Sequence, residues 1–156
     1  MKLLVIGIGN RLRQDDAFGP IVAEELEKQL NDPRIEIREC AGLTPELAEN
    51  VSQAEHVLFI DASTEIAAGI LEHRELHRDS KPDMSLVHFL SPEALLEWAA
   101  RLYGVAPSAE IWLMGAAETG LSEQLTATVS AKLPEVLENL TGRIRSLANA
   151  ALCNGP

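Results

Sequence analysis

The feature that most constrains the fold is an apolar run at the start of the chain, Leu3 to Ile8, which ends at Gly9. The run is too short for a helix and is rich in branched side chains, so it predicts a β-strand. Because no polar residue alternates with the apolar ones, we expect both faces of this strand to be buried. Strands of this kind belong to parallel sheets that carry helices on both sides.

Strand and helix patterns alternate along the rest of the chain. Further strands are expected at residues 35–40, 56–61, 69–77 and 110–115. Helices are expected at residues 16–30, 45–52, 92–103 and from residue 122 onward, with an interruption at Pro134. The alternation predicts a single-domain, three-layer α/β sandwich, in which a largely parallel, twisted sheet of about five strands has helices on both faces. We expect the domain to span residues 1–150, and residues 151–156 to form a frayed tail.

The composition narrows the class of protein. Hydrophobic residues make up 46% of the 156 residues and charged ones 24%, which is ordinary for a globular protein. The net charge of −11 creates a field that repels nucleic acid. No apolar stretch is long enough to span a membrane, and residues 1–15 lack the features of a secretory signal. With only Cys40 and Cys153, no disulfide framework is expected, so the sequence predicts a cytoplasmic protein that binds neither nucleic acid nor membrane.

Candidate site residues gather at one edge of the predicted sheet. In open α/β sheets, ligands bind beyond the carboxyl ends of the strands. Asp15 and Asp16 follow the first strand, and Asp61 ends the third. Carboxylates together with an imidazole suit a divalent transition metal, and three such ligands leave coordination positions open for substrate or water. Each aspartate also has an ordinary explanation: Asp15 and Asp16 suit the start of a helix, and Asp61 suits hydrogen bonds with loop amides.

Of the four histidines, His88 is the best candidate for the nitrogen ligand. His56 opens a strand at the opposite end of the sheet and is expected to be structural. His73 and His77 lie in or beside a charged edge strand and are expected to be solvated. His88 lies in an apolar loop segment just ahead of the helix that Ser91 caps; the alternative is a packed histidine bonded to the backbone.

Gly7 and Gly9 invite a different interpretation, a nucleotide-binding turn. The third glycine of that fingerprint is absent, because Leu12 occupies its position. The simpler explanation is that the two glycines permit a tight turn from strand to helix. The chain also lacks the helical zinc motif H-E-x-x-H and the nucleophile elbow G-x-S-x-G.

The opening motif has a fixed order and spacing. It consists of Val5–Asn10, Leu12, Asp15–Asp16 and Gly19–Pro20. This motif resembles the opening signature of the hydrogenase maturation endopeptidases, and the resemblance continues through residues 57–62 to the C-terminal helix. It implies a three-layer α/β enzyme that removes a C-terminal extension from the large-subunit precursor of a nickel–iron hydrogenase after nickel insertion. The nickel is then held by the substrate and recognised by the protease, and no organic cofactor is implied.

The resemblance also assigns the site. It implies that Asp16, Asp61 and a later histidine are both nickel ligands and catalytic residues. Some family members carry that histidine directly after the proline that starts a helix, where this chain has Glu93; others carry it a few residues earlier, which matches His88. Glu93 suits the negative-favouring start of a helix, so we prefer His88. A glycine-rich box of the family is replaced here by residues 39–44, a variant that resembles members serving bidirectional, NAD-linked hydrogenases.

The mechanism favoured by these residues is metal-assisted peptide hydrolysis by an endopeptidase of aspartic or metallo type. Asp16, Asp61 and His88 would hold the nickel of the immature subunit and fix the scissile bond nearby. One alternative is a binding module that checks nickel occupancy without cutting. The other is a nucleotide-binding α/β protein that uses the turn at Gly7–Asn10.

Overall fold

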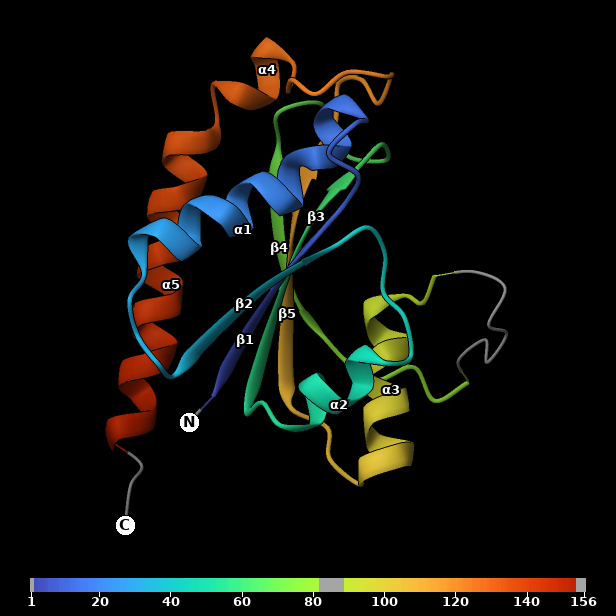
Figure 1. Cartoon of the computed structure of the whole chain (residues 1–156), viewed down its shortest axis with the longest axis vertical. Helices are drawn as coiled ribbons and strands as arrows, with labels where there is room; N and C mark the ends of the chain where they lie inside the picture. The colour runs from blue at the N-terminus through green and yellow to red at the C-terminus, as the bar shows by residue number, and fades with distance from the viewer. Residues whose placement is uncertain (1, 82–88, 154–156) are drawn as a thin grey trace.

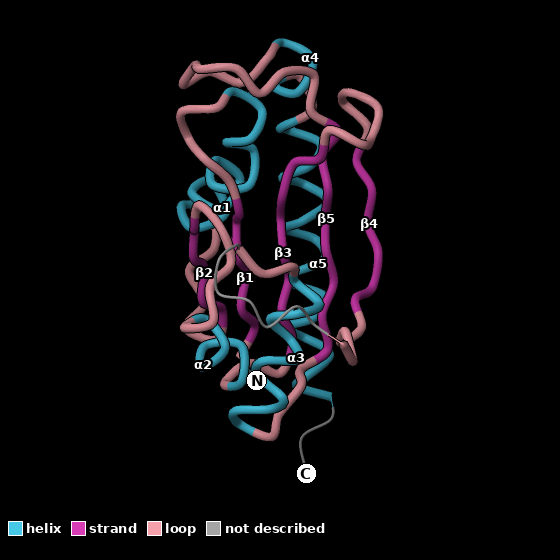
Figure 2. Tube along the Cα trace, turned by 90° about the vertical axis from the view of Figure 1, so that its right-hand side faces the viewer, coloured by secondary structure: helices cyan, strands magenta, loops and turns pink. Residues whose placement is uncertain are grey.

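Five strands form one sheet in the order β2-β1-β3-β5-β4 (Figures 1 and 2). The computed structural model describes residues 2–81 and 89–153. The strands are β1 (Leu3–Ile8), β2 (Ile35–Cys40), β3 (His56–Ser63), β4 (Leu71–Leu76) and β5 (Ser108–Gly115). All neighbouring pairs are parallel except β4 and β5, so four carboxyl ends meet at one edge of the sheet.

Helices cover both faces of the sheet, as Figure 1 shows. The helices are η1 (Gln14–Ala17, a 3-10 turn), α1 (Phe18–Gln29), α2 (Leu47–Ser52), α3 (Pro92–Tyr103), α4 (Ala127–Ser130) and α5 (Leu133–Cys153). Leu3 and Val5 of β1 belong to the apolar cluster that α1 and α5 cover. Leu4 and Ile6 belong to the cluster under α2 and α3. The first strand is therefore buried on both faces, and the predicted three-layer α/β fold with five strands is confirmed.

Several expected boundaries were wrong. β3 continues past Asp61 to Ser63, because its last residues still pair with β5. The C-terminal helix does not begin at residue 122. Thr126 instead caps the short α4, because its hydroxyl accepts a hydrogen bond from the Val129 amide. Helix α5 begins separately at Leu133. Pro134 therefore lies in the first turn of α5, where a missing N–H is harmless, and interrupts nothing.

Two further expectations concern the C-terminal end of the domain and membrane-spanning helices. Helix α5 continues to Cys153, and the domain boundary at residue 150 stays a prediction. Within residues 2–81 and 89–153, no helix combines the length and the apolar character that a membrane crossing needs.

Candidate active site

Asp16 is held above the end of β1 by a tight turn. The chain leaves β1 through Gly9, which has a φ of +147°, and a Cβ at that position would come within 1.7 Å of the Asp16 carbonyl oxygen. The backbone amide of Asn10 donates to Oδ2 of Asp16 over 2.8 Å. The glycine thus allows the turn to close, and the turn fixes the Asp16 carboxylate.

Gly19 sets how closely α1 approaches the sheet. A Cβ there would lie 2.3 Å from the Ile8 carbonyl oxygen and 2.5 Å from that of Ile60. Helix α1 therefore begins directly over the ends of β1 and β3. Because β1 and β3 are neighbours with Gly7 opposite Ile60, this approach brings η1, which carries Asp16, to the strand end that carries Asp61.

Asp61 is a carboxylate in an unfavourable place for a charge. Burial, together with the nearby charge of Asp16, raises its pKa from 3.8 to about 7. Its Oδ1 accepts a hydrogen bond from the Ala62 amide over 2.8 Å. A cation at this position would oppose the shift, because it would stabilise the ionised form of Asp61 and offset the repulsion from Asp16.

Cys40 lies at the same edge, at the end of β2. Burial and the Asp61 carboxylate raise the pKa of its thiol to about 11. The thiol is therefore protonated at neutral pH and unsuited to act as a nucleophile. A cavity of about 220 Å³ opens beside it, lined by Gly9, Arg11, Pro20, Glu39, Cys40 and Ala41.

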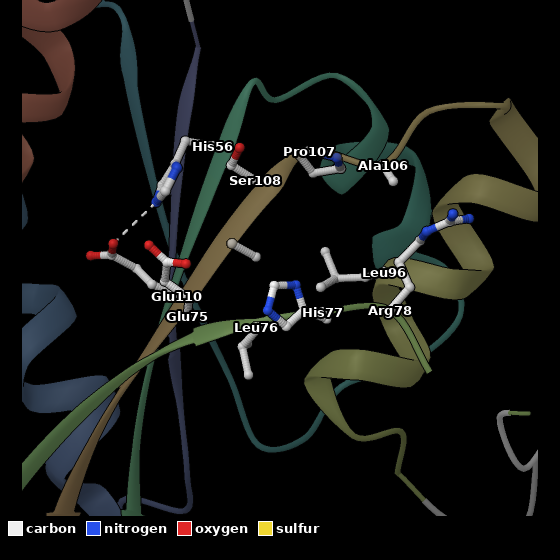
Figure 3. A pocket seen from close by; sticks show the side chains of 11 residues that line it. His56, Glu75, Leu76, His77, Arg78, Leu96, Ala106, Pro107, Ser108 and Glu110 are labelled. Carbon is white, nitrogen blue, oxygen red and sulfur yellow. Dashed lines mark ion pairs between the residues drawn. The ribbon is translucent and has the colours of Figure 1, made fainter. Parts of the chain in front are cut away.

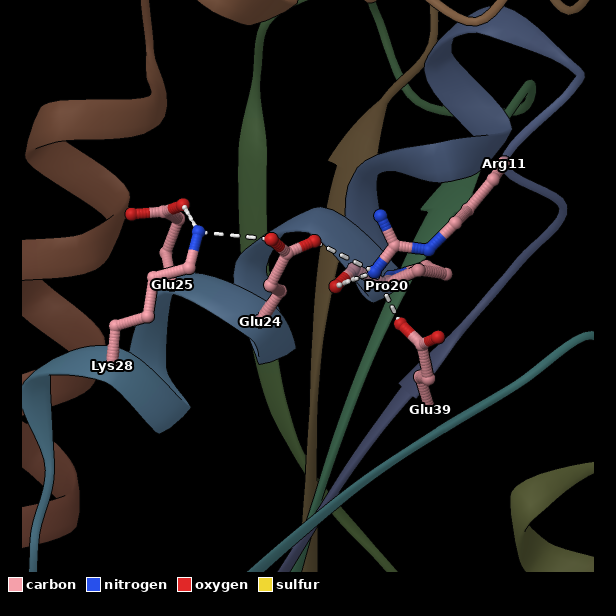
Figure 4. A network of polar contacts seen from close by, with 6 residues as sticks. All are labelled: Arg11, Pro20, Glu24, Glu25, Lys28 and Glu39. Atoms are coloured by element: carbon pink, nitrogen blue, oxygen red, sulfur yellow. Dashed lines mark hydrogen bonds and ion pairs between the residues drawn. The ribbon is translucent and has the colours of Figure 1, made fainter.

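Arg11 links the first loop to β2 and α1, as Figure 4 shows. Its guanidinium forms ion pairs with Glu39 of β2 and, over 2.9 Å, with Glu24 of α1. The same Glu24 pairs with Lys28 over 2.9 Å. The sequence does not predict this network, because Arg11 and Glu39 are 28 residues apart and no motif relates them.

Asp15 has a different duty from its neighbour. It is completely buried, and it caps neither η1 nor α1. Its carboxylate accepts hydrogen bonds from the amides of Ala117, Glu118 and Thr126 and from the Thr126 hydroxyl, at 2.8–3.2 Å. Burial opposes ionisation, but these bonds outweigh it and hold the pKa of Asp15 below its usual value. Asp15 therefore fastens the loop of residues 116–126 to the loop that carries Asp16.

The third expected ligand, His88, lies outside the described residues. Phe89, the next residue in sequence, packs against Gly42, and Leu90 pairs with Leu43 through a hydrogen bond of 2.8 Å. Glu93, the alternative ligand, pairs with Arg74 of β4 over 3.2 Å. Among residues 2–81 and 89–153, no cluster of three metal-binding side chains is formed. The structure thus brings Asp16 and Asp61 together and leaves the third position to His88 as a prediction.

A second cavity, of about 330 Å³, lies at the amino end of β3 and β5 (Figure 3). Buried Glu110 lies beside it and is paired with Arg143 over 2.7 Å, with His56 at 3.4 Å and His73 at 3.5 Å. His56 opens β3 at this end of the sheet, as expected. His73 is exposed, as expected, and one face of its ring stacks on Trp112 with 4.5 Å between centroids. This cavity is at the end of the parallel strands where ligand sites are not expected, so we place the candidate site at the carboxyl end.

Comparison with known proteins finds chains of similar sequence and fold. No family model matches the chain. The chain is 29% identical over 154 residues to the hydrogenase 2 maturation protease of Escherichia coli (strain K12), which covers 93% of this chain and 92% of that protein. Its fold matches the solved structure of the hydrogenase maturating endopeptidase HybD from E. coli, with a TM-score of 0.72 and 26% identity over 94% of this chain and 93% of that one. Over nearly its whole length, the chain is therefore similar to hydrogenase maturation endopeptidases.

The maturation endopeptidase fold extends to more distant proteins. A NiFe hydrogenase maturation protease, HycI from Thermococcus kodakarensis KOD1, matches with a TM-score of 0.72 at 21% identity, over 89% of both chains. The nucleotide interpretation finds no support in the turn after β1. The Asn10 amide, which a phosphate would need, already donates to the Asp16 carboxylate.

Proposed function

We propose that this protein is an endopeptidase that removes the C-terminal extension of a nickel–iron hydrogenase large-subunit precursor after nickel has been inserted, and that Asp16, Asp61 and His88 recognise the nickel. The observation that carries the proposal is the carboxylate pair at the carboxyl edge of the sheet. Asp61 is partly buried beside Asp16, and this burial together with the Asp16 charge raises its pKa to about 7. A nickel ion held by the substrate would supply that charge.

Recognition and cleavage then use the same residues. Nickel binding would displace the proton that Asp61 holds near neutral pH, and the substrate's metal would be gripped between the two carboxylates. The grip fixes the scissile bond next to the site, which supplies proximity. Water attacks the carbonyl carbon of that bond, the C–N bond breaks, and the leaving amine takes a proton. The cavity beside Gly9 and Cys40 gives room for the substrate chain.

His88 is the proposed third ligand for two reasons. The neutral imidazole completes a donor set suited to nickel, and the next residue in the chain, Phe89, packs at the end of β2, beside the site edge. Glu93 is less suitable because its carboxylate already pairs with Arg74. The cellular location proposed for the enzyme is the cytoplasm, where the precursor would be made.

The test is cleavage of a purified precursor large subunit, with and without nickel, read by intact mass. We expect loss of a C-terminal peptide only from the nickel-loaded form. Asp16→Asn keeps an oxygen acceptor for the Asn10 amide but removes the charge, so it should lower kcat/KM by about 100-fold or more without changing Tm. His88→Ala should have a similar effect, and Glu93→Ala should retain most of the activity.

The outcomes separate the candidate functions. Normal processing by Asp16→Asn would show that the site is wrong, and loss of activity in Glu93→Ala alone would replace His88 with Glu93. If the wild-type protein binds the nickel-loaded precursor but never cuts it, the non-cleaving binding module becomes the better account.

A further inference from the structure

Two leucines stand exposed on loops beside the candidate site. Leu12 is 51% exposed and Leu121 is 91% exposed. They lie on residues 10–14, which follow β1, and on residues 119–122, which follow β5. We call Leu12, Leu121 and these two short segments the leucine rim. Leu12 belongs to the opening sequence motif, yet neither the fold nor the nickel site explains an exposed leucine there.

Hydrogen bonds hold the two segments of the leucine rim together. Four hydrogen bonds of 2.9–3.2 Å join its two segments: Ser122 amide to Leu12 carbonyl, Gln14 amide to Ser122 carbonyl, Arg13 guanidinium to Thr119 carbonyl, and Gly120 amide to the Gln14 side chain. Buried Asp15 fastens the loop behind it. The leucines are therefore held outward by a paired backbone, and they cannot turn into the core without breaking these bonds.

The leucine rim is continuous with the proposed nickel site. The Leu12 amide donates to the Asn10 side chain over 2.9 Å, and the Asn10 amide donates to Asp16. Asp16 can reach a nickel ion inside a folded subunit only if the loop that carries it lies against the surface of that subunit. Leu12, on the same loop, and Leu121, on the loop bonded to it, must then meet that surface as well.

We propose that the leucine rim docks onto an apolar patch of the folded precursor beside its nickel site. This proposal rests on the proposed function and names the surface that the substrate meets. Single exposed apolar residues are ordinary, but two on rigid, mutually bonded loops next to a site indicate an interaction surface. Apolar contact of this kind is not screened by salt.

The experiment compares Leu12→Ser, Leu121→Ser and the double variant with wild type on the nickel-loaded precursor, measuring KM, kcat and precursor affinity. The matched control is Leu102→Ser. Leu102 is 56% exposed near the C-terminal end of α3, which lies at the opposite end of the molecule (Figures 1 and 2). We expect the double variant to raise KM and weaken precursor binding about tenfold, with kcat retained. The control should change none of the three.

Each result has one meaning. If wild type cleaves and the double variant keeps the control's KM and affinity, the leucine rim is refuted and the proposed function stands. If wild type never cleaves the precursor, the proposed function fails. The precursor affinity of the double variant, compared with that of the control, then tests alone whether the leucine rim is a docking surface. A double variant that turns a dimer into a monomer with unchanged KM would assign the rim to a second copy and overturn the proposal. Should Leu12→Ser fail to fold, Leu121→Ser alone decides, because its side chain is almost wholly exposed.

Discussion

At the scale of single residues, the site depends on a carboxylate placed where its charge is unfavourable. The folded chain raises the pKa of Asp61 to about 7 from an ordinary 3.8. Between these two values the folded protein binds a proton that the unfolded chain releases. The stability that Asp61 contributes is therefore complete below pH 3.8, and it is lost as the pH rises through 7. Residues selected for chemistry commonly reduce stability in this way.

Asp61→Asn should therefore separate stability from function. We expect a higher Tm than wild type at pH 8, no such gain at pH 4, and loss of precursor processing at pH 8. Thermal unfolding at the two pH values measures the first effect. Exposed Glu65→Gln is the control, because it removes a nearby charge of the same sign from the surface. A Tm gain of equal size at pH 4 would contradict the assigned cause.

At the scale of elements, the site edge consists of loops fastened to one another. Asp15 accepts bonds from both ends of the loop of residues 116–126, and the pairing of Arg13 with Ser122 joins this loop to the turn after β1. The two adjacent aspartates thus have different roles. Asp15 holds the loop of residues 116–126 to the turn after β1, and Asp16 belongs to the candidate site. Neither duty is helix capping.

Asp15→Asn should loosen this edge while the sheet stays folded. The new amide group presents N–H to backbone N–H donors, so we expect a loss of about 1–3 kcal/mol in the free energy of unfolding. Hydrogen exchange should speed up at the amides of Ala117, Glu118 and Thr126. Asp16→Asn serves as the control and should leave these three amides protected. Unchanged protection in Asp15→Asn would show that the buried carboxylate does not hold the loop.

The sequence predicts the three layers well because each buried parallel strand can be recognised from its own consecutive residues. The run Leu3–Ile8 needs no partner to be recognised, and Asp61 stands out as an acid near the end of such a run. The bonds that complete the site are not local. Asp15 and Thr126 are 111 residues apart, and the stacking of His73 on Trp112 joins residues of two different strands. The start of the last helix was misplaced because an amphipathic pattern does not reveal that Thr126 caps a separate short helix.

At the scale of the whole molecule, a buried ion pair ties the sheet to its longest helix. Glu110 of β5 is paired with Arg143 of α5, across the interface of two layers. Burial opposes the charge of Glu110, but His56, Arg143 and Trp112 outweigh it and hold its pKa far below 4.5. The pair therefore contributes stability that is present above the unfolded pKa and is lost as the pH falls toward the folded one.

Arg143→Ala should weaken the contact of α5 with the sheet. Removing one partner leaves Glu110 buried and unpaired, so the free energy of unfolding should fall by about 2–4 kcal/mol at pH 7. The deficit should shrink at pH 4, because Glu110 of the variant can take up a proton. Urea unfolding at both pH values measures this. Arg145→Ala, an exposed arginine on the same helix, is the matched control and should change little.

The carboxylates at the two ends of the sheet differ in how many bonding partners they have within the chain. Glu110 at one end has its partners within the chain, whereas the Asp61 carboxylate at the other is bonded to the amide of its own neighbour and repelled by Asp16. Under the proposed function, the nickel that Asp16 and Asp61 bind arrives with the substrate. A precursor that has not yet received its nickel therefore offers these carboxylates no ion to hold.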